Sequence, residues 1–185
     1  MGYIVGDVII ISTNVLFKGE VYMRLIHLSD LHIGKRVNEF SMLEDQEYIL
    51  KEILGIIDDE QPDGVIIAGD VYDKSVPSEE AVKLLDSFLT SLAKRKLQVY
   101  IISGNHDSAA KLAFASSLID LSGIHISPVY DSAQIATMGD GLVRPYKLED
   151  GKGQVANIYM LPFVKPAMVR AVFPDAVSYT HLTLP

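Results

Sequence analysis

Alternating strand-like and helical segments predict an α/β fold, a sandwich of two β-sheets flanked by helices. Three apolar runs are each followed by a segment with helical spacing, which is typical of parallel strands covered by helices. From Ala133 onward the sequence changes to short strand-like runs separated by turns, which we expect to form a second sheet packed on the first. Each of the three apolar runs leads into Asp, His or Asn, so a candidate site is expected at the carboxyl edge of the first sheet.

The first strand is predicted at Met23–Leu28, and a loop over Gly34–Phe40 follows the polar residues at its end. Ser41 and Glu44 have the spacing of a capping box, so the first helix is expected to begin there. Apolar residues then recur at helical spacing: Met42, Ile49, Ile53, Ile56 and Ile57.

The second strand is predicted to start at the turn-forming Pro62–Gly64 and to end at Asp70. Ser78 is the expected N-cap of the second helix, and acidic residues in the first turn favour the helix dipole. The cations of Lys94–Lys96 close this helix, and we interpret them as a solvated helix end rather than a DNA-binding patch. The buried stripe of the helix is predicted to comprise Val82, Leu85, Phe88, Leu89 and Leu92.

The third strand is predicted at Leu97–Ile102, followed by a helix over about residues 109–121 and a short strand at Ile124–Ile126. In the last part of the chain, turns are expected at Gly139–Gly141 and Asp150–Gly153, and Ile158–Leu161 is the clearest strand.

The two ends of the sequence do not fit this pattern. Residues 1–22 are interpreted as a non-native leader, with Met23 as the natural start, because Lys18–Glu20 is what a purine-rich ribosome-binding site would encode. The alternative is an extra edge strand. Residues 178–185 are interpreted as a non-native tail, which leaves residues 23–177 as the N-terminal part of one domain.

Composition limits the classes of function. The net charge of -8 argues against a protein that coats DNA, although bound metal ions would weaken that objection. No cysteine is present, so any metal must be held by His, Asp, Glu or Asn, ligands that suit Mn, Mg, Fe or Zn. We find no signal peptide and no apolar run of the about 20 residues that a membrane-spanning helix needs, so a cytoplasmic protein is expected.

The polar residues at the three strand ends are candidate metal ligands. Asp30 and His32 are two positions apart and can point to the same side of a strand, toward one ion. Asp70 has two carboxylate oxygens and can bridge two ions, and Asn105 offers an amide oxygen. This mixed set fits a two-metal hydrolytic centre.

Two neighbouring residues are candidate catalytic groups. His106 lies next to the ligands and can protonate or stabilise the leaving oxygen. Asp107 can orient that imidazole or can simply cap the next helix. Lys35 and Arg36 follow the first ligands directly and are candidates for contact with a phosphate backbone, whereas His27 and His125 are interpreted as strand residues, the latter near the surface.

The motifs Asp30–Gly34, Gly69–Asp73 and Gly104–Asp107 resemble the first three motifs of the calcineurin-like metallophosphoesterases. Within that superfamily, the flanking segments Leu28–Lys35 and Leu161–Pro166, together with the helix around Gln46, resemble the SbcD family of bacterial nuclease subunits. The resemblance extends from Met23 to about Ala176.

This resemblance implies a Mn-dependent nuclease, with Mg as the alternative metal, that acts on double-strand DNA ends and hairpins during DNA repair, recombination and replication. It implies an SbcC-type coiled-coil ATPase as partner, a homodimer at full length, and no membrane association. By motif, Asp30 and His32 would bind the first metal, Asp70 would bridge, Asn105 would bind the second metal, and His106 would act on the leaving group.

The family pattern also has later histidine ligands, and the one late histidine here, His181, lies in the unrelated tail. The 185-residue chain is therefore expected to bind Mn weakly and to cleave DNA poorly. Two alternatives remain open at this point: a small-substrate phosphoesterase of the same superfamily, and a non-catalytic module that binds DNA ends or the ATPase.

Overall fold

The computed structural model describes residues 2–5, 8–17, 20–108, 112, 119–127, 145–164 and 167, with only the backbone described before Met23. The predicted third helix falls almost wholly outside the described residues, as do the turn at Gly139–Gly141 and the tail with His181. No helix in the described part of the chain is long and apolar enough to cross a bilayer.

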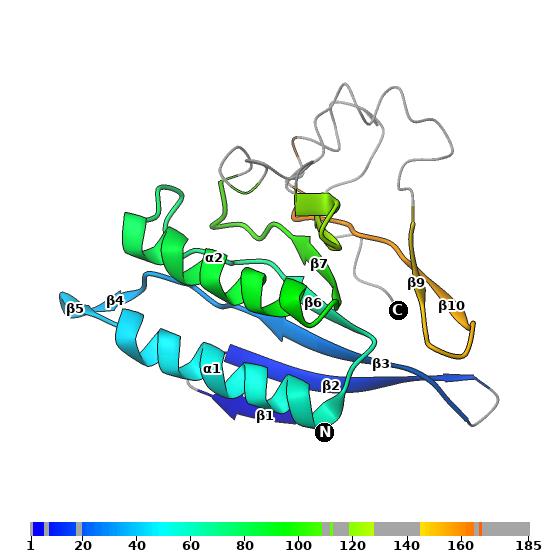
Figure 1. The fold of residues 1–185 in the computed structure, drawn as a ribbon. Coiled ribbons are helices and arrows are strands. Elements are labelled where there is room, and N and C mark those ends of the chain that lie inside the picture. Colours follow the sequence, from blue (N-terminus) through cyan, green and yellow to red (C-terminus); the bar gives the residue numbers. More distant parts are fainter. Residues whose placement is uncertain are drawn as a thin grey trace, which may run out of the picture.

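A six-stranded sheet forms the centre of the molecule (Figure 1). Four of its strands run parallel as neighbours, in the order β3, β6, β7 and β8, as the alternation of strands and helices predicts. In spatial order the six strands are β1 (Gly2–Val5), β2 (Val8–Phe17), β3 (Glu20–Ser29), β6 (Gly64–Ala68), β7 (Gln98–Ile102) and β8 (Ile124–Ser127).

The described residues before Met23 take the strand conformation that the sequence left as an alternative. β2 pairs antiparallel with β3, and β1 pairs antiparallel with β2. This pairing extends the sheet at the β3 edge, on the side away from β6. That the segment is a non-native leader stays a prediction.

Two helices, α1 (Leu43–Glu60) and α2 (Glu79–Lys94), lie together on one face of the sheet (Figure 1). Strand residues at alternate positions, such as Ile26, Ile67 and Ile101, pack against them in one buried cluster. This face holds the main core, because period-two alternation sends one set of side chains from every strand toward the helices.

The opposite face is covered by a hairpin of β9 (Tyr146–Glu149) and β10 (Val155–Ile158). The intervening strand residues, including Leu25 and Tyr100, pack with Leu148 of the hairpin in a second buried cluster. The predicted sandwich of two sheets is therefore confirmed.

The predicted capping box at Ser41 and Glu44 is wrong. The first helix begins at Leu43 with Met42 as its N-cap, and this cap makes no side-chain hydrogen bond. Ser41 belongs instead to β5 (Phe40–Ser41), which pairs with β4 (Arg36–Val37). Because the pairing holds Ser41 ahead of the helix, the predicted loop is a short hairpin.

The other cap prediction is confirmed, since Ser78 Oγ accepts a hydrogen bond of 3.3 Å from the Ala81 amide at the start of α2. The strand expected at Ile158–Leu161 is wrong in position, because β10 ends at Ile158. Beyond it, Met160 is buried in the second cluster, and the Phe163 amide donates to the Ser103 carbonyl at 2.9 Å. This apolar run thus crosses the sheet edge without pairing as a strand.

Candidate metal centre

Three of the predicted ligands come together at the carboxyl edge of the sheet. The donor atoms of Asp30, His32 and Asp70 all lie within 4.8 Å of one another. His32 Nε2 is 3.9 Å from Asp30 Oδ1 and 4.0 Å from Asp70 Oδ2. Asp30 follows β3 and Asp70 follows β6, so the parallel pairing of these strands creates the cluster.

The geometry and chemistry of this cluster fit a divalent ion. Donor atoms bound at about 2.1 Å to one ion lie no more than about 4.2 Å apart, so one ion can span the His32 nitrogen and either carboxylate. Two carboxylates and an imidazole, without thiolate, suit Mn, Mg, Fe or Zn.

The second nitrogen of His32 supports this assignment. His32 Nδ1 is buried and has no hydrogen-bond partner among the residues that the structure describes, and it lies 3.8 Å from Asp73 Oδ1. Metal-binding histidines usually donate their other ring N–H to a carboxylate, which fixes the tautomer. Asp73 is thus placed to orient His32, a role that reasoning from the residues alone did not assign.

The backbone at all three ligands has positive φ: 57° at Asp30, 41° at His32 and 48° at Asp70. Positive φ is uncommon outside glycine, and such conformations cost on the order of 1–3 kcal/mol each. They persist only where the surrounding structure imposes them, and they cluster at functional sites. Four other described non-glycine residues have positive φ, Asn38, Glu39, Gln61 and Lys96, so the conformation alone does not mark a site; at Asp30, His32 and Asp70 it accompanies the turns that bring these side chains together.

A buried glutamine holds the loop that carries the first two ligands. Gln46 of α1 accepts a hydrogen bond of 2.9 Å from the Gly34 amide and donates to the carbonyls of Leu31 at 3.2 Å and His32 at 2.7 Å. The side chain is about nine-tenths buried. In the sequence, Gln46 stands out as a polar residue on the apolar face of the helix, at the position between Met42 and Ile49 where helical spacing would place an apolar side chain.

The loop after β7 is held against Asp70 by a close backbone approach. A Cβ atom at Gly104 would lie 2.1 Å from Asp70 Oδ1, so only glycine fits this position. The Asp70 carboxylate accepts a hydrogen bond of 3.0 Å from the His106 amide. The glycine thus makes room for the central carboxylate.

The contacts of Asp107 are those of a positioning residue. Its carboxylate accepts hydrogen bonds from the amides of Gly104 at 2.8 Å, Val71 at 3.2 Å and Tyr72 at 3.1 Å. These bonds join the loop after β7 to the loop after β6. Neither of the two roles considered from the sequence accounts for them, and a direct catalytic role for Asp107 stays a prediction.

His106 and Asn105 lie on the same loop and are both exposed. The His106 ring lies edge-on to the His32 ring, with centroids 5.4 Å apart. The candidate acid is therefore beside the cluster without being part of it. Asn105 lies between Gly104 and His106, within the loop that binds Asp70.

The other candidate residues lie around this centre. Lys35 follows the His32 loop, and its amide donates to the His32 carbonyl at 3.0 Å. Arg36 begins the short hairpin, is exposed, and donates to the Glu39 carbonyl. His125 lies in β8 as predicted; its side chain is 13% exposed and its ring bonds the half-exposed Asp120.

The fold and this site define a class of protein. The family model for calcineurin-like phosphoesterases matches residues 23–176, and the chain belongs to that family.

Within the family, the chain is similar to proteins named as the SbcD component of the nuclease SbcCD. It is 34% identical to that of Staphylococcus epidermidis over 160 residues, and 32% identical to that of Staphylococcus saprophyticus over 161 residues. Each alignment covers 86% of this chain and 39% of the relative. The chain thus spans about two fifths of the length of these relatives.

Proposed function

We propose that this chain is the metal-binding part of a DNA nuclease subunit that hydrolyses phosphodiesters at a two-metal site, as a double-strand exonuclease and hairpin endonuclease. The cluster of Asp30, His32 and Asp70 at the carboxyl edge of the sheet carries the proposal. The similarity to components of a nuclease supports DNA as the substrate class.

The residues have separate roles in this proposal. Asp30 and His32 would hold one ion, Asp70 would contribute to the sites of both ions, and Asn105 would hold the other. Two bound divalent ions would supply Lewis-acid stabilisation of the phosphate and would activate a water molecule near neutral pH. Mn is the proposed metal and Mg the alternative.

His106 is the proposed proton donor to the leaving oxygen. Its ring is exposed beside the cluster, so it can face a substrate phosphate without competing for the ion. An imidazolium there donates its proton to the leaving oxygen as the P–O bond breaks, which neutralises the developing charge. Asp107 supports this step by fixing the loop that carries the histidine.

The relatives are named as one component of a complex, SbcCD, and we propose an SbcC-type coiled-coil ATPase as the partner. We further propose a homodimer at full length, a cytoplasmic location, and a role in DNA repair and recombination. Residues 23–177 are proposed as the N-terminal part of the nuclease domain.

The test grafts residues 23–176 into the corresponding segment of the Staphylococcus epidermidis relative. We expect Mn-dependent cleavage of hairpin DNA and of double-strand ends. His106→Ala should lower the cleavage rate by about 10²–10⁴-fold while the Mn²⁺ content stays near that of the parent. The exposed Asp86→Asn in α2 is the control and should change neither value.

A graft that cleaves a small chromogenic diester but not DNA would favour a small-substrate phosphoesterase instead. Calorimetric Mn²⁺ titration of the 185-residue chain is the second measurement, so a graft that fails to fold does not end the test. Binding that survives Asp70→Asn unchanged would contradict the assigned site.

A further inference from the structure

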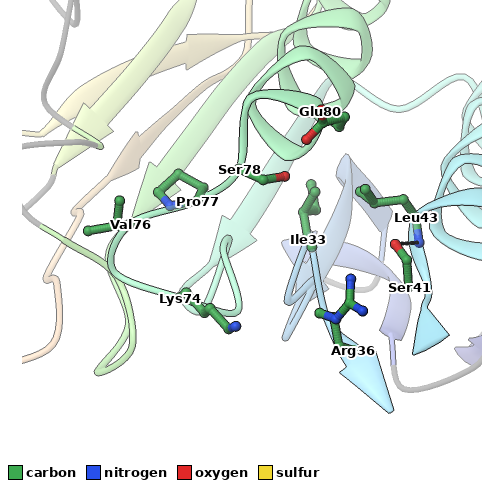
Figure 2. A pocket seen from close by; sticks show the side chains of 10 residues that line it. Ile33, Arg36, Ser41, Leu43, Lys74, Val76, Pro77, Ser78 and Glu80 are labelled. Atoms are coloured by element: carbon green, nitrogen blue, oxygen red, sulfur yellow. Dashed lines mark hydrogen bonds between the residues drawn. The ribbon is translucent and has the colours of Figure 1, made fainter. Parts of the chain in front are cut away.

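A pocket of about 470 Å³ lies beside the metal centre, among the β4–β5 hairpin, the loop before α2 and the start of α2 (Figure 2). We call it the hairpin pocket. Its volume is within the range of small-ligand sites, which are about 300–1,000 Å³. The roles proposed above leave it without a ligand.

The hairpin pocket is continuous with the metal-ligand loops. Its lining residues Ile33 and Lys74 directly follow His32 and Asp73 in the sequence. The two loops are bonded together, since the Asp73 amide donates to the Ile33 carbonyl at 3.2 Å. A substrate strand that leaves the metal centre on this side would follow these loops toward the pocket.

One end of the hairpin pocket is cationic. Arg36 and Lys74 both line the pocket, and Figure 2 draws both on the side away from Glu80. One guanidinium nitrogen of Arg36 donates a hydrogen bond to the Glu39 carbonyl. Lys74 has no ion pair within the described part of the chain. In a chain of net charge -8, two cations that line one pocket are candidates for contact with a phosphate.

The rest of the hairpin pocket combines apolar side chains with the hydroxyls of Ser41 and Ser78 and the carboxylate of Glu80. Ile33, Leu43 and Pro77 line the middle (Figure 2). At the far side lies the exposed carboxylate of Glu80, whose pKa is lowered by hydrogen bonds from its own backbone amide and from the Ser78 hydroxyl. A carboxylate can accept a hydrogen bond from an exocyclic amino group of a nucleobase.

We propose that the hairpin pocket binds one nucleotide of the DNA strand next to the phosphate at the metal centre. The phosphate lies between Arg36 and Lys74, the base packs on Ile33, Leu43 and Pro77, and Glu80 faces the edge of the base. This inference rests on the proposed nuclease function and adds a second point of contact with the substrate.

The test measures binding of a fluorescein-labelled DNA hairpin with a single-stranded extension to the 185-residue chain by anisotropy, without divalent ions. Lys74→Gln should weaken binding several-fold and reduce the slope of log affinity against log salt by about 0.7, the share of one single-strand phosphate. The control is Lys83→Gln, an exposed lysine of α2 that pairs with Glu79 and should change neither quantity.

An extension built from abasic residues tests the base contact. Wild-type protein should bind it several-fold more weakly than the normal extension, and Leu43→Ser should remove most of that difference. Equal effects of Lys74→Gln and Lys83→Gln, or equal binding of abasic and normal DNA, would overturn the proposal. Because these titrations exclude divalent ions, they stay separate from the Mn²⁺ titrations that test the metal centre.

Discussion

Gln46 shows how a single buried side-chain amide can hold the loop that carries Asp30 and His32. Gln46→Met keeps the side-chain volume but removes the hydrogen bonds to the Gly34 amide and to the Leu31 carbonyl, while the His32 carbonyl keeps its bond from the Lys35 amide. Each buried group left unsatisfied costs about 1–3 kcal/mol. We expect a lower free energy of unfolding and about 10–100-fold weaker Mn²⁺ binding, the usual cost of losing an outer-shell partner. Urea unfolding and calorimetry check these values, with the exposed Glu47→Gln as control.

Gly104 allows a second prediction at the scale of one residue. Gly104→Ala would place a methyl group 2.1 Å from Asp70 Oδ1, so the central carboxylate must move. We expect Mn²⁺ affinity to fall by at least about tenfold. The control is Gly55→Ala in α1, where nothing lies within 4 Å of the added methyl. That change should raise stability by about 0.5–1 kcal/mol and leave Mn²⁺ affinity unchanged.

At the scale of elements, α1 and α2 are joined by an ion pair at their ends. Arg95 donates to both carboxylate oxygens of Asp58, each at 2.7 Å. This hydrogen bonding lowers the pKa of Asp58 from its usual value of 3.8. The contribution to stability is therefore present above pH 3.8 and is lost as the pH falls through the lowered pKa.

Arg95→Gln should thus lower the melting temperature at pH 7 by a small amount, and the difference from wild type should vanish near pH 2. Scanning calorimetry at both pH values measures it. Lys83→Gln breaks only an exposed pair within α2 and serves as the control. A difference that is the same at both pH values would show that Arg95 acts through packing.

The elements also show what local sequence could predict. The positions of Asp30, Asp70 and His106 after strands could be predicted, because each follows a continuous apolar run that is typical of a buried strand. The capping box at Ser41 was not, because pairing with β4 depends on the hairpin and overrides a local helix signal. The contacts of Asp107 depend on how two strand ends meet in space, and no local pattern contains that information.

For the whole molecule, we expect the negative charge gathered at the centre to oppose folding in the absence of metal. Asp30, Asp70 and Asp73 surround one histidine. Asp70→Asn keeps an oxygen acceptor for the His106 amide but removes like-charge repulsion. We expect the melting temperature of the metal-free protein to rise by about 2–4 °C, the shift that 1 kcal/mol produces in a domain of this size. Mn²⁺ should stabilise this variant less than the wild type.

Asp86→Asn removes the same charge from an exposed position on α2 and should leave the melting temperature nearly unchanged. If both variants gain equally, net charge rather than the cluster is responsible. Differential scanning fluorimetry with and without Mn²⁺ distinguishes these outcomes.

The bonding between the two ligand loops has a consequence for hydrogen exchange. Loops usually open locally at little cost, so their amide hydrogens exchange quickly with solvent. Here the amides of His32 and Ile33 donate to the carbonyls of Asp70 and Val71, both at 2.9 Å, and continue the pairing of β3 with β6 beyond the strands. These amides should exchange as slowly as those of the sheet itself. The ligand cluster would then come apart only in openings that also separate the two strands.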